Sequence, residues 1–318
     1  MFSPILVVGS FVQDLTFFVG RFPAAGETLK GKFVTGPGGK GSNQAVAAAR
    51  AGVQTAFFGA VGEDAFGDGA ELFLTSEGIE RHLLRIPDAG TGTAGIIVNA
   101  EGQNSIVVAL GASEKFGLAD VPPALLEAAQ IVVLQLEIHL DTVRDVLQAA
   151  RRLGKTTLLN PAPMNPDLDF AILSDVDIFI PNETELVAIV KAHPALALAD
   201  FSEEKLHALA PDDLQALCRR LQVPTVIVTL GKKGAFISRE SGFEFIPALQ
   251  NIPVVDTTGA GDAFVGGFAA GLILFGGDIS QAARHGTVVA GLSVTKLGTA
   301  PAMPTQAEIA ACRARFSQ

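Results

Sequence analysis

Short runs of apolar, often β-branched residues alternate along this chain with segments of helical pattern. Because parallel strands need a helical crossover, this alternation predicts βαβ units and a mostly parallel sheet covered on both faces by helices. The expected fold class is therefore α/β, with a doubly wound sheet. The expected strands of this sheet are Ile5 to Val8, Thr55 to Ala60, Ile131 to Leu134, Thr156 to Asn160, Ile178 to Ile180 and Val226 to Thr229.

A second group of strands follows a different pattern, with apolar and polar positions alternating as in antiparallel strands. Between two of them, Asn99-Ala-Glu-Gly102 has the residue types of a hairpin turn. We therefore expect a smaller antiparallel element beside the main sheet, made of Thr16 to Val19, Leu29 to Thr35, Ile96 to Asn99 and Ile106 to Ala109.

A glycine-rich turn lies between Ile252 to Val255, expected to end a strand, and Ala263 to Phe275, expected to form a helix. Gly259 to Gly261 then lie at the helix N-terminus, where free N–H groups and the helix dipole favour a phosphate. Asp262 beside them can accept a proton from an attacking hydroxyl. Phosphoryl transfer to an alcohol needs both a site that binds the phosphate and a group that accepts the proton of the hydroxyl. The alternative is that Asp262 only caps the helix, since aspartate is a favoured capping residue.

A second glycine cluster opens another helix, in the segment Thr35-Gly-Pro-Gly-Gly-Lys-Gly-Ser-Asn-Gln-Ala-Val-Ala-Ala-Ala-Arg-Ala-Gly52. Together with Asp256-Thr-Thr-Gly-Ala-Gly-Asp-Ala-Phe264, it resembles the two signature segments of the PfkB family of carbohydrate kinases, and it is most similar to the ribokinase branch. Other motifs follow in the order of that branch: Pro23-x-x-Gly-Glu-Thr28, Asn160-Pro-Ala-Pro163, Pro181-Asn-Glu-Thr-Glu185 and Thr229-Leu-Gly231. The resemblance covers about Val7 to Pro301.

The resemblance implies one ribokinase-like kinase domain over residues 1–318, with lid strands within about 14–36 and 92–110 that cover the sugar and pair two copies into a homodimer. It implies transfer of the γ-phosphate of ATP to the primary hydroxyl of a small sugar, with ribose or a similar pentose expected first. Asp262 would be the general base, and the amides of Gly259, Ala260 and Gly261 would stabilise the transferred phosphoryl group. The sugar hydroxyls would be bound by Asp14, Gly39, Lys40, Asn43, Glu137 and Asp262.

The resemblance also implies sites for the nucleotide and for two cations. Asn182, Thr229, Gly231 and Gly234 would border the nucleotide. Asn182 and Glu185, three residues apart, would hold Mg²⁺ through water, although the same pair is also a good helix start. A monovalent cation, expected to be K⁺, would lie between two loops, one with Asp256 and Thr258 and the other with Ser293, Lys296 and Gly298. The alternative for Asp256 is a plain residue at a strand end.

Composition narrows the class of protein further. The 318 residues are 48% hydrophobic, and the formal net charge of -10 argues against a nucleic-acid partner. Cys218 and Cys312 are far apart, in polar helical contexts, so we expect no disulfide and a reducing compartment. The segment Met1 to Val8 has no basic region typical of a signal peptide, and the longest uncharged apolar run, Ala263 to Gly277, is too short to span a bilayer. We expect a cytoplasmic protein.

One residue departs from the ribokinase pattern. In Gly9-Ser-Phe-Val-Gln-Asp14, Val12 replaces an asparagine, and a valine can neither donate nor accept a hydrogen bond. A sugar hydroxyl met there in ribokinases would go unpaired, which keeps another sugar, a deoxysugar or a nucleoside open as the substrate. The segment 191–211 exceeds the usual length of the family, and its sequence assigns it no function.

Two functions of other classes are also open: a sugar-binding regulatory protein without catalysis, and an NAD-dependent oxidoreductase. The intact Gly259-Ala-Gly-Asp262 argues against the first. Gly90-Thr-Gly-Thr-Ala-Gly95 matches a dinucleotide fingerprint, but it precedes an expected strand instead of a helix. The five histidines show no metal-ligand spacing and are expected at the surface or at helix caps: His82, His139, His193, His207 and His285.

Overall fold

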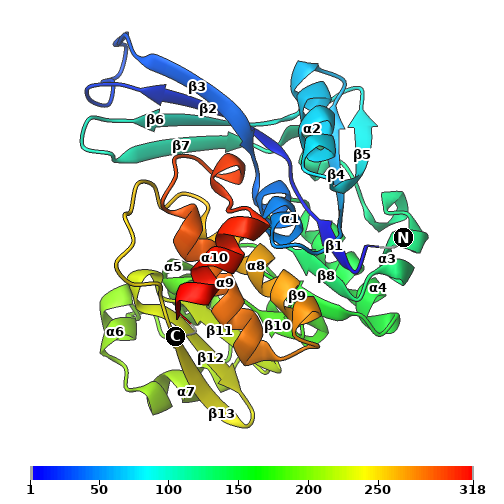
Figure 1. Ribbon diagram of the computed structural model, residues 1–318, viewed down its shortest axis with the longest axis vertical. Helices are drawn as coiled ribbons and strands as arrows, with labels where there is room; N and C mark the ends of the chain where they lie inside the picture. Colours follow the sequence, from blue (N-terminus) through cyan, green and yellow to red (C-terminus); the bar gives the residue numbers. More distant parts are fainter. Residues whose placement is uncertain (1–2, 317–318) are drawn as a thin grey trace.

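A nine-stranded sheet forms the centre of this computed structural model, which describes residues 3–316 and so leaves Met1 and Phe2 of the N-terminal segment outside it (Figure 1). The strands from β11 to β5 pair in parallel, whereas β12 pairs antiparallel with both neighbours. The predicted doubly wound α/β fold is confirmed. In spatial order the strands are β13 (Gly242–Pro247), β12 (Gly234–Arg239), β11 (Thr225–Thr229), β10 (Ile178–Phe179), β9 (Thr156–Leu159), β8 (Ile131–Leu134), β1 (Ile5–Val8), β4 (Thr55–Gly62) and β5 (Glu80–Ile86).

Helices cover both faces of this sheet, because successive strand residues point to opposite sides. In β1, Leu6 and Val8 pack into one core and Ile5 and Val7 into the other. The first face carries α3 (Pro123–Ala128), α4 (Leu140–Arg152), α5 (Glu183–Ala192), α6 (Glu203–Ala208) and α7 (Pro211–Arg219). The second carries α1 (Lys40–Arg50), α2 (Ala65–Ser76), α8 (Ala260–Leu274), α9 (Ile279–Ser293) and α10 (Gln306–Phe316). Short 3₁₀ turns lie at η1 (Gly111–Glu114), η2 (Leu118–Asp120), η3 (Phe170–Asp175), η4 (Gly231–Lys233) and η5 (Ala300–Ala302).

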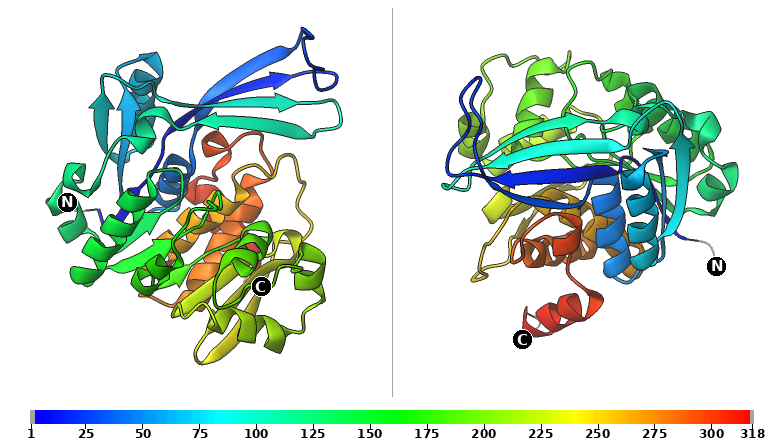
Figure 2. Two further views of the ribbon diagram at one scale, coloured as in Figure 1. Left: turned by 180° about the vertical axis from the view of Figure 1, so that it is seen from behind. Right: turned by 90° about the horizontal axis from the view of Figure 1, so that it is seen from above.

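A second, four-stranded sheet stands to one side of the large sheet, and we call it the lid sheet (Figures 1 and 2). Its order is β3 (Lys32–Gly38), β2 (Val12–Phe18), β6 (Gly92–Val98) and β7 (Asn104–Ala109). The predicted turn is present, since the Gly102 N–H donates to the Asn99 carbonyl at 3.1 Å. β2–β3 and β6–β7 are antiparallel as predicted, but β2 and β6 pair in parallel, so the lid sheet is mixed.

The predicted strand at Ile252 to Val255 is wrong. These residues belong to an irregular connection between β13 and α8. The side chains of Val254 and Val255 are 64% and 59% exposed, and Pro253 cannot donate a ladder hydrogen bond. Instead the Val255 and Asp256 N–H groups both donate to the carbonyl of Val294. The segment is therefore held to the loop after α9 by backbone hydrogen bonds, and its apolar residues are not part of the sheet.

Two further expectations need correction. His285 in α9 is buried, 4% exposed, and it packs against the Phe275 ring instead of lying at the surface. Burial, together with the positive charge of Arg313, lowers its pKa to about 4. Cys218 and Cys312 are not joined in a disulfide, and both are buried within their helices. Among the described residues, no helix is both long and apolar enough to cross a bilayer.

Candidate active site

Asp262 lies in the first turn of α8, and this helix begins at the predicted glycine-rich turn. Gly259 is the N-cap residue, with φ of 77°, a backbone conformation that glycine adopts without strain. The Asp262 side chain does not cap the helix, so the alternative role is excluded. Ala260 N–H is turned to the Thr257 carbonyl at 3.2 Å, whereas Gly261 and Asp262 N–H find no backbone acceptor in the described chain. Of the three amides predicted to face a phosphate, those of Gly259, Ala260 and Gly261, only the Ala260 N–H donates to a backbone carbonyl in the described chain.

Two amide side chains of α1 hold the Asp262 carboxylate. Asn43 Nδ2 donates to Oδ2 at 3.0 Å, and Gln44 Nε2 donates to Oδ1 at 2.9 Å. Gln44 also contacts Asn160 Oδ1 at 3.0 Å and accepts from Gln135 at 2.7 Å. All of these side chains are buried. A carboxylate fixed by two amide donors keeps its orientation.

Gln44, Gln135 and Asn160 were missed as site residues by the sequence analysis. The signal was present for two of them, because Gln44 follows Asn43 in the glycine-rich motif and Asn160 begins the Asn-Pro-Ala-Pro motif. Gln135 follows a plain apolar strand and carries no motif. Two acceptors of this amide network, Asn43 Oδ1 and Gln135 Oε1, are buried without a partner in the described part of the chain. An unpaired buried acceptor is costly, so Asn43 Oδ1, on the amide that holds Asp262, is suited to meet a hydroxyl donor of a ligand.

Lys40 and four carboxyl groups form the charged centre of the site. Although burial lowers the Lys40 pKa, the nearby carboxylates raise it on balance, with Asp262 contributing most, followed by Glu137, Glu185 and Asp14. The lysine therefore stays protonated. Burial raises the pKa of Asp14 and of Glu185, and the positive charge of Lys40 offsets part of that rise.

Asp14 and Glu137 lie at the base of the lid sheet. Glu137 accepts hydrogen bonds from Ser10 Oγ at 2.6 Å and from the Lys40 N–H at 2.9 Å. Asp14 Oδ2 accepts a long hydrogen bond of 3.3 Å from Thr299 Oγ1, which also contacts the Pro37 carbonyl. Burial raises the pKa of Asp14 to about 6, and the charges of Glu137 and Asp262 add to the rise.

A cavity of about 140 Å³ joins most of the predicted catalytic residues. Its wall contains Lys40, Asn182, Glu185, Thr229, Gly259, Gly261 and Asp262, together with Asn160. Gly39 is the N-cap of α1 and precedes Lys40 directly. The structure therefore brings two helix N-termini, those of α1 and α8, to one small polar space. Such a space can stabilise negative charge that develops during a reaction.

Asn182 and Glu185 form a closed capping box at the start of α5. Asn182 Oδ1 accepts from the Glu185 N–H at 2.8 Å, and Glu185 Oε2 accepts from the Asn182 N–H at 2.8 Å. The structure thus shows the helix-start role. Glu185 nevertheless faces the 140 Å³ cavity, and burial raises its pKa to about 7. A carboxylate at that place can also bind a hydrated divalent cation, which prefers oxygen ligands.

A larger pocket of about 550 Å³ adjoins this cavity and shares Asn182, Thr229 and Gly261 with it. Its wall includes Gly231 and Gly234, the other residues predicted to border a nucleotide, and its remaining lining is largely apolar, with Leu249, Ile252, Val254, Phe264 and Val294. An apolar slot that ends in helix N-termini suits a flat base that carries phosphates.

The two loops predicted to hold a monovalent cation meet at Asp256. Its Oδ1 accepts from the N–H and hydroxyl of Thr258, and its Oδ2 accepts from the Gly298 N–H at 2.9 Å. Ser293 Oγ is occupied with the Ala290 carbonyl, and Lys296 Nζ pairs with Glu308. Among residues 3–316, no group of three histidine, cysteine, aspartate or glutamate side chains lies close enough together to hold a metal ion.

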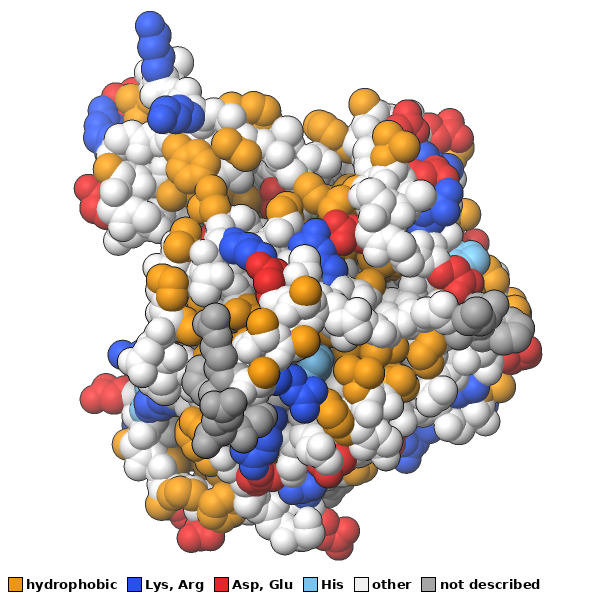
Figure 3. Space-filling model, in the orientation of Figure 1, with side chains coloured by type: hydrophobic (Ala, Val, Ile, Leu, Met, Phe, Trp, Pro, Cys, Tyr) orange, Lys and Arg blue, Asp and Glu red, His pale blue; other side chains and the backbone are white. Residues whose placement is uncertain are grey.

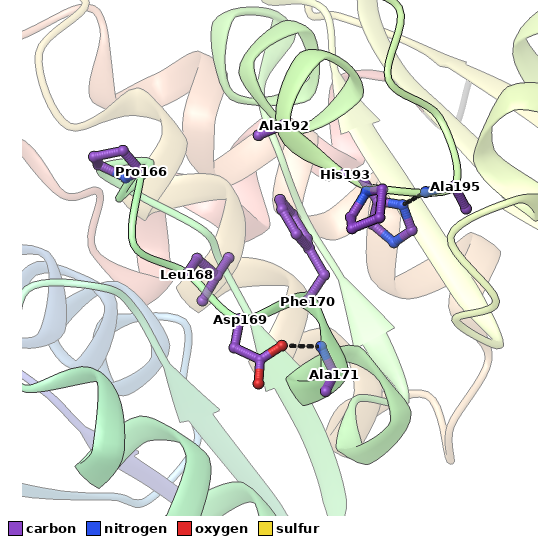
Figure 4. Close-up of a pocket in the computed structure, with 9 residues that line it drawn as sticks. Pro166, Leu168, Asp169, Phe170, Ala171, Ala192, His193 and Ala195 are labelled. Atoms are coloured by element: carbon purple, nitrogen blue, oxygen red, sulfur yellow. Dashed lines mark hydrogen bonds between the residues drawn. The ribbon is translucent and has the colours of Figure 1, made fainter.

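A further hollow of about 490 Å³ lies elsewhere, between η3 and the end of α5 (Figure 4). Figure 4 shows the Phe170 ring facing His193, and their ring centroids are 4.7 Å apart. None of the predicted site residues lines this hollow. Asp169 is the carboxylate in its wall, and its Oδ1 accepts from the Ala171 N–H at 2.9 Å.

Comparisons with known proteins agree with this geometry. The family model "pfkB family carbohydrate kinase" matches residues 3–306. A deoxyribokinase of Salmonella typhi is 36% identical over 95% of this chain and 95% of its own length. The ribokinase structure from Giardia lamblia has a TM-score of 0.89 at 31% identity, covering 99% of this chain and 100% of that one. The Arabidopsis thaliana ribokinase complexed with ribose and ATP has a TM-score of 0.82 at 30% identity, covering 98% of both chains.

The raised pKa of Asp14 predicts a pH-dependent stability. The unfolded chain ionises this carboxyl with a pKa near 3.8, but the folded state does so with a pKa of about 6, so the folded state binds the extra proton between these values. Stability is therefore lost as pH rises through this window. The substitution Asp14→Asn should raise the free energy of unfolding by about 1–3 kcal/mol more at pH 8 than at pH 4.5.

Urea denaturation at both pH values measures this difference. Asp88→Asn, at an exposed carboxylate on a loop, is the matched control and should show no pH-dependent gain. An equal effect of Asp14→Asn at the two pH values would contradict the raised pKa.

Proposed function

Because this chain belongs to the pfkB family of carbohydrate kinases, we propose that it transfers the γ-phosphate of ATP to the primary hydroxyl of ribose or a similar pentose. The observation that carries this proposal is the Asp262 carboxylate, held by Asn43 and Gln44 at the N-terminus of α8. Its two amide partners fix its orientation in the wall of the cavity that Lys40 also lines. A base next to an anion cradle is the requirement of phosphoryl transfer to an alcohol.

Sugar binding, proton transfer and stabilisation of the transferred phosphoryl group each have residues suited to them. Asp14, Glu137 and the unpaired Asn43 Oδ1 pair the hydroxyls of the pentose and turn its primary hydroxyl to Asp262. Asp262 accepts the proton as the hydroxyl oxygen attacks phosphorus. The charge on the transferred phosphoryl group is stabilised by the open amides of Gly261 and Asp262, by the dipole of α8 and by Lys40. A regulatory protein without catalysis would not require this base.

The 550 Å³ pocket is the place that we propose for the nucleotide, with its base among the apolar side chains and its phosphates toward the 140 Å³ cavity. The solved ribokinase of Arabidopsis thaliana, similar over 98% of this chain, contains ribose and ATP. We propose Mg²⁺ near Asn182 and Glu185, where it would neutralise phosphate charge. We propose K⁺ between the Asp256 loop and the 293–298 turn, and activity in potassium compared with tetramethylammonium buffer tests this.

The lid sheet is proposed to pair two copies of the chain. Its outer strand β7 is exposed along its whole length, and Figure 3 shows apolar side chains gathered on the lid sheet. Unpaired strand edges with apolar faces are otherwise protected in folded proteins. The exposed apolar residues are Phe17, Phe33, Val34, Ile106, Val107 and Val108. A monomeric mass by analytical ultracentrifugation at micromolar concentration would refute the pairing.

A 2-deoxypentose is the second candidate substrate, and Val12 favours it. Val12 and Asp14 are two residues apart in β2 and so lie on the same face of the strand. Val12 is 2% exposed and offers no hydrogen bond. A sugar carbon without a hydroxyl would place no unpaired hydrogen-bonding group against the Val12 side chain. A deoxyribokinase is also among the similar proteins.

The catalytic role of Asp262 is tested by Asp262→Asn. The amide has nearly the same shape but cannot accept the proton, so kcat should fall by about 10²- to 10⁴-fold, the usual effect of losing a positioned general base. Coupled ADP release measures kcat, and calorimetry should show that ATP binding persists. The exposed Asp88→Asn is the control. Turnover of the purified, folded Asp262→Asn protein within a few-fold of the parent would exclude Asp262 as the base.

The substrate preference is tested at Val12. Val12→Asn restores a hydrogen-bonding side chain, so kcat/KM for D-ribose should rise relative to 2-deoxy-D-ribose, by an amount that corresponds to about 1–3 kcal/mol for an unpaired buried hydroxyl. Val12→Leu keeps the position apolar and should leave the ratio near that of the parent. If the parent already prefers ribose and Val12→Asn does not change the ratio, Val12 does not determine the choice of sugar.

A further inference from the structure

The segment 191–211, which the sequence left without a function, contributes α6 to the first face of the sheet. Ser202 caps this helix by accepting from the Lys205 N–H, and Leu206 is buried in the core. α6 packs against α5, and Figure 1 shows the two helices as neighbours. The segment is therefore an ordered part of the fold, and its polar residues are held at fixed places.

Two side chains of α6 reach residues at the start of α5. Glu203 Oε1 accepts from the Thr184 hydroxyl at 2.6 Å, and His207 Nε2 lies 3.1 Å from Glu183 Oε1. The other ring nitrogen of His207, Nδ1, lies 2.8 Å from Lys233 Nζ in η4. One histidine thus joins α5 to the turn after β11.

The chemistry of these partners fixes the histidine tautomer. A lysine ammonium has only donors, so His207 Nδ1 must accept from it. The remaining proton of the neutral ring is then on Nε2 and is donated to the Glu183 carboxylate. The result is a chain of hydrogen bonds from Lys233 through His207 to Glu183, in which each ring nitrogen of His207 has a partner.

Two of the residues that α6 contacts lie in the wall of the 550 Å³ pocket, and the residues at this edge are called its rim. Glu183, Thr184 and Lys232 line it, and Lys233 follows Lys232 directly. A Cβ placed on Gly231 would lie 3.7 Å from Glu183 Oε2, so the carboxylate is packed against the turn. Without a partner, the Glu183 carboxylate would be free to turn toward the pocket, where it would repel phosphates.

We propose that His207 is a positioning residue for the nucleotide: through Glu183 and Lys233 it holds the two sides of the pocket rim at the spacing that ATP needs. This rests on the proposed placement of ATP in the 550 Å³ pocket. His207 touches no reacting atom, and the effect of its loss falls on ATP binding alone. The pentose site, built from the lid sheet and α1, is independent of it.

The test is His207→Ala in the full-length protein, with the ATP dissociation constant measured by calorimetry and both KM values by coupled ADP release. We expect the dissociation constant and KM for ATP to rise about two- to fivefold, the range for partly exposed ion pairs. The kcat and the KM for the pentose stay unchanged. His207→Gln, whose amide offers both an acceptor and a donor, restores part of the affinity.

Lys205→Ala is the matched control, since Lys205 is an exposed cation on the same helix. It should leave all constants unchanged. An ATP affinity of His207→Ala equal to that of the parent overturns the proposal, and so does a parallel rise in both KM values with a lower melting temperature, which would indicate general destabilisation. A parent protein that binds no ATP refutes the proposed function itself, and this outcome is separate because it appears before any variant is compared.

Discussion

The close approach of α8 to α1 is the contact on which the active site depends. At Gly266 of α8, a Cβ would overlap the carbonyl oxygen of Gln44 and lie 2.6 Å from the Ala47 Cβ. Only glycine allows the backbones to come this near. One turn earlier in α8, the same proximity lets Asn43 and Gln44 reach the Asp262 carboxylate. The orientation of the proposed base is thus a result of helix packing, and the motif glycines serve the packing as well as the phosphate.

The local hydrophobic pattern and the motifs were sufficient to predict the α/β fold and most strands of the large sheet. The apolar runs at β1, β8 and β11 are read correctly because both faces of these strands are buried and the runs are continuous. The run at Ile252 to Val255 is also apolar, but it contains Pro253 and lies at the surface. A four-residue apolar run carries no information on whether a sheet has room for it, and here α8 follows an edge strand through a long connection.

The site was predictable where residues act through short motifs, and less so where they act through space. Asn43, Asp262 and Lys40 come from two glycine-rich segments and meet as expected. The link from Gln135 through Gln44 to Asn160 joins three separate parts of the chain, and each amide is ordinary in its own neighbourhood. His285 was misread for a similar reason, because its burial depends on Phe275 and on α10. The burial and the partners of such residues are determined by contacts between distant parts of the chain.

The same arrangement has a consequence for how the protein is made. The candidate active site draws on both ends of the chain, since Thr299 donates to Asp14, and Asp262 pairs with side chains more than 200 positions before it. On the ribosome, α1 emerges long before α8. Its polar N-terminal end and its alanines Ala45, Ala47 and Ala48 therefore lack the packing of α8 while most of the sheet is synthesised. The nascent chain can assemble the face that carries α4 and α5 first. The opposite face closes only when α8 leaves the exit tunnel, and a shortened chain would have a sheet but no working centre.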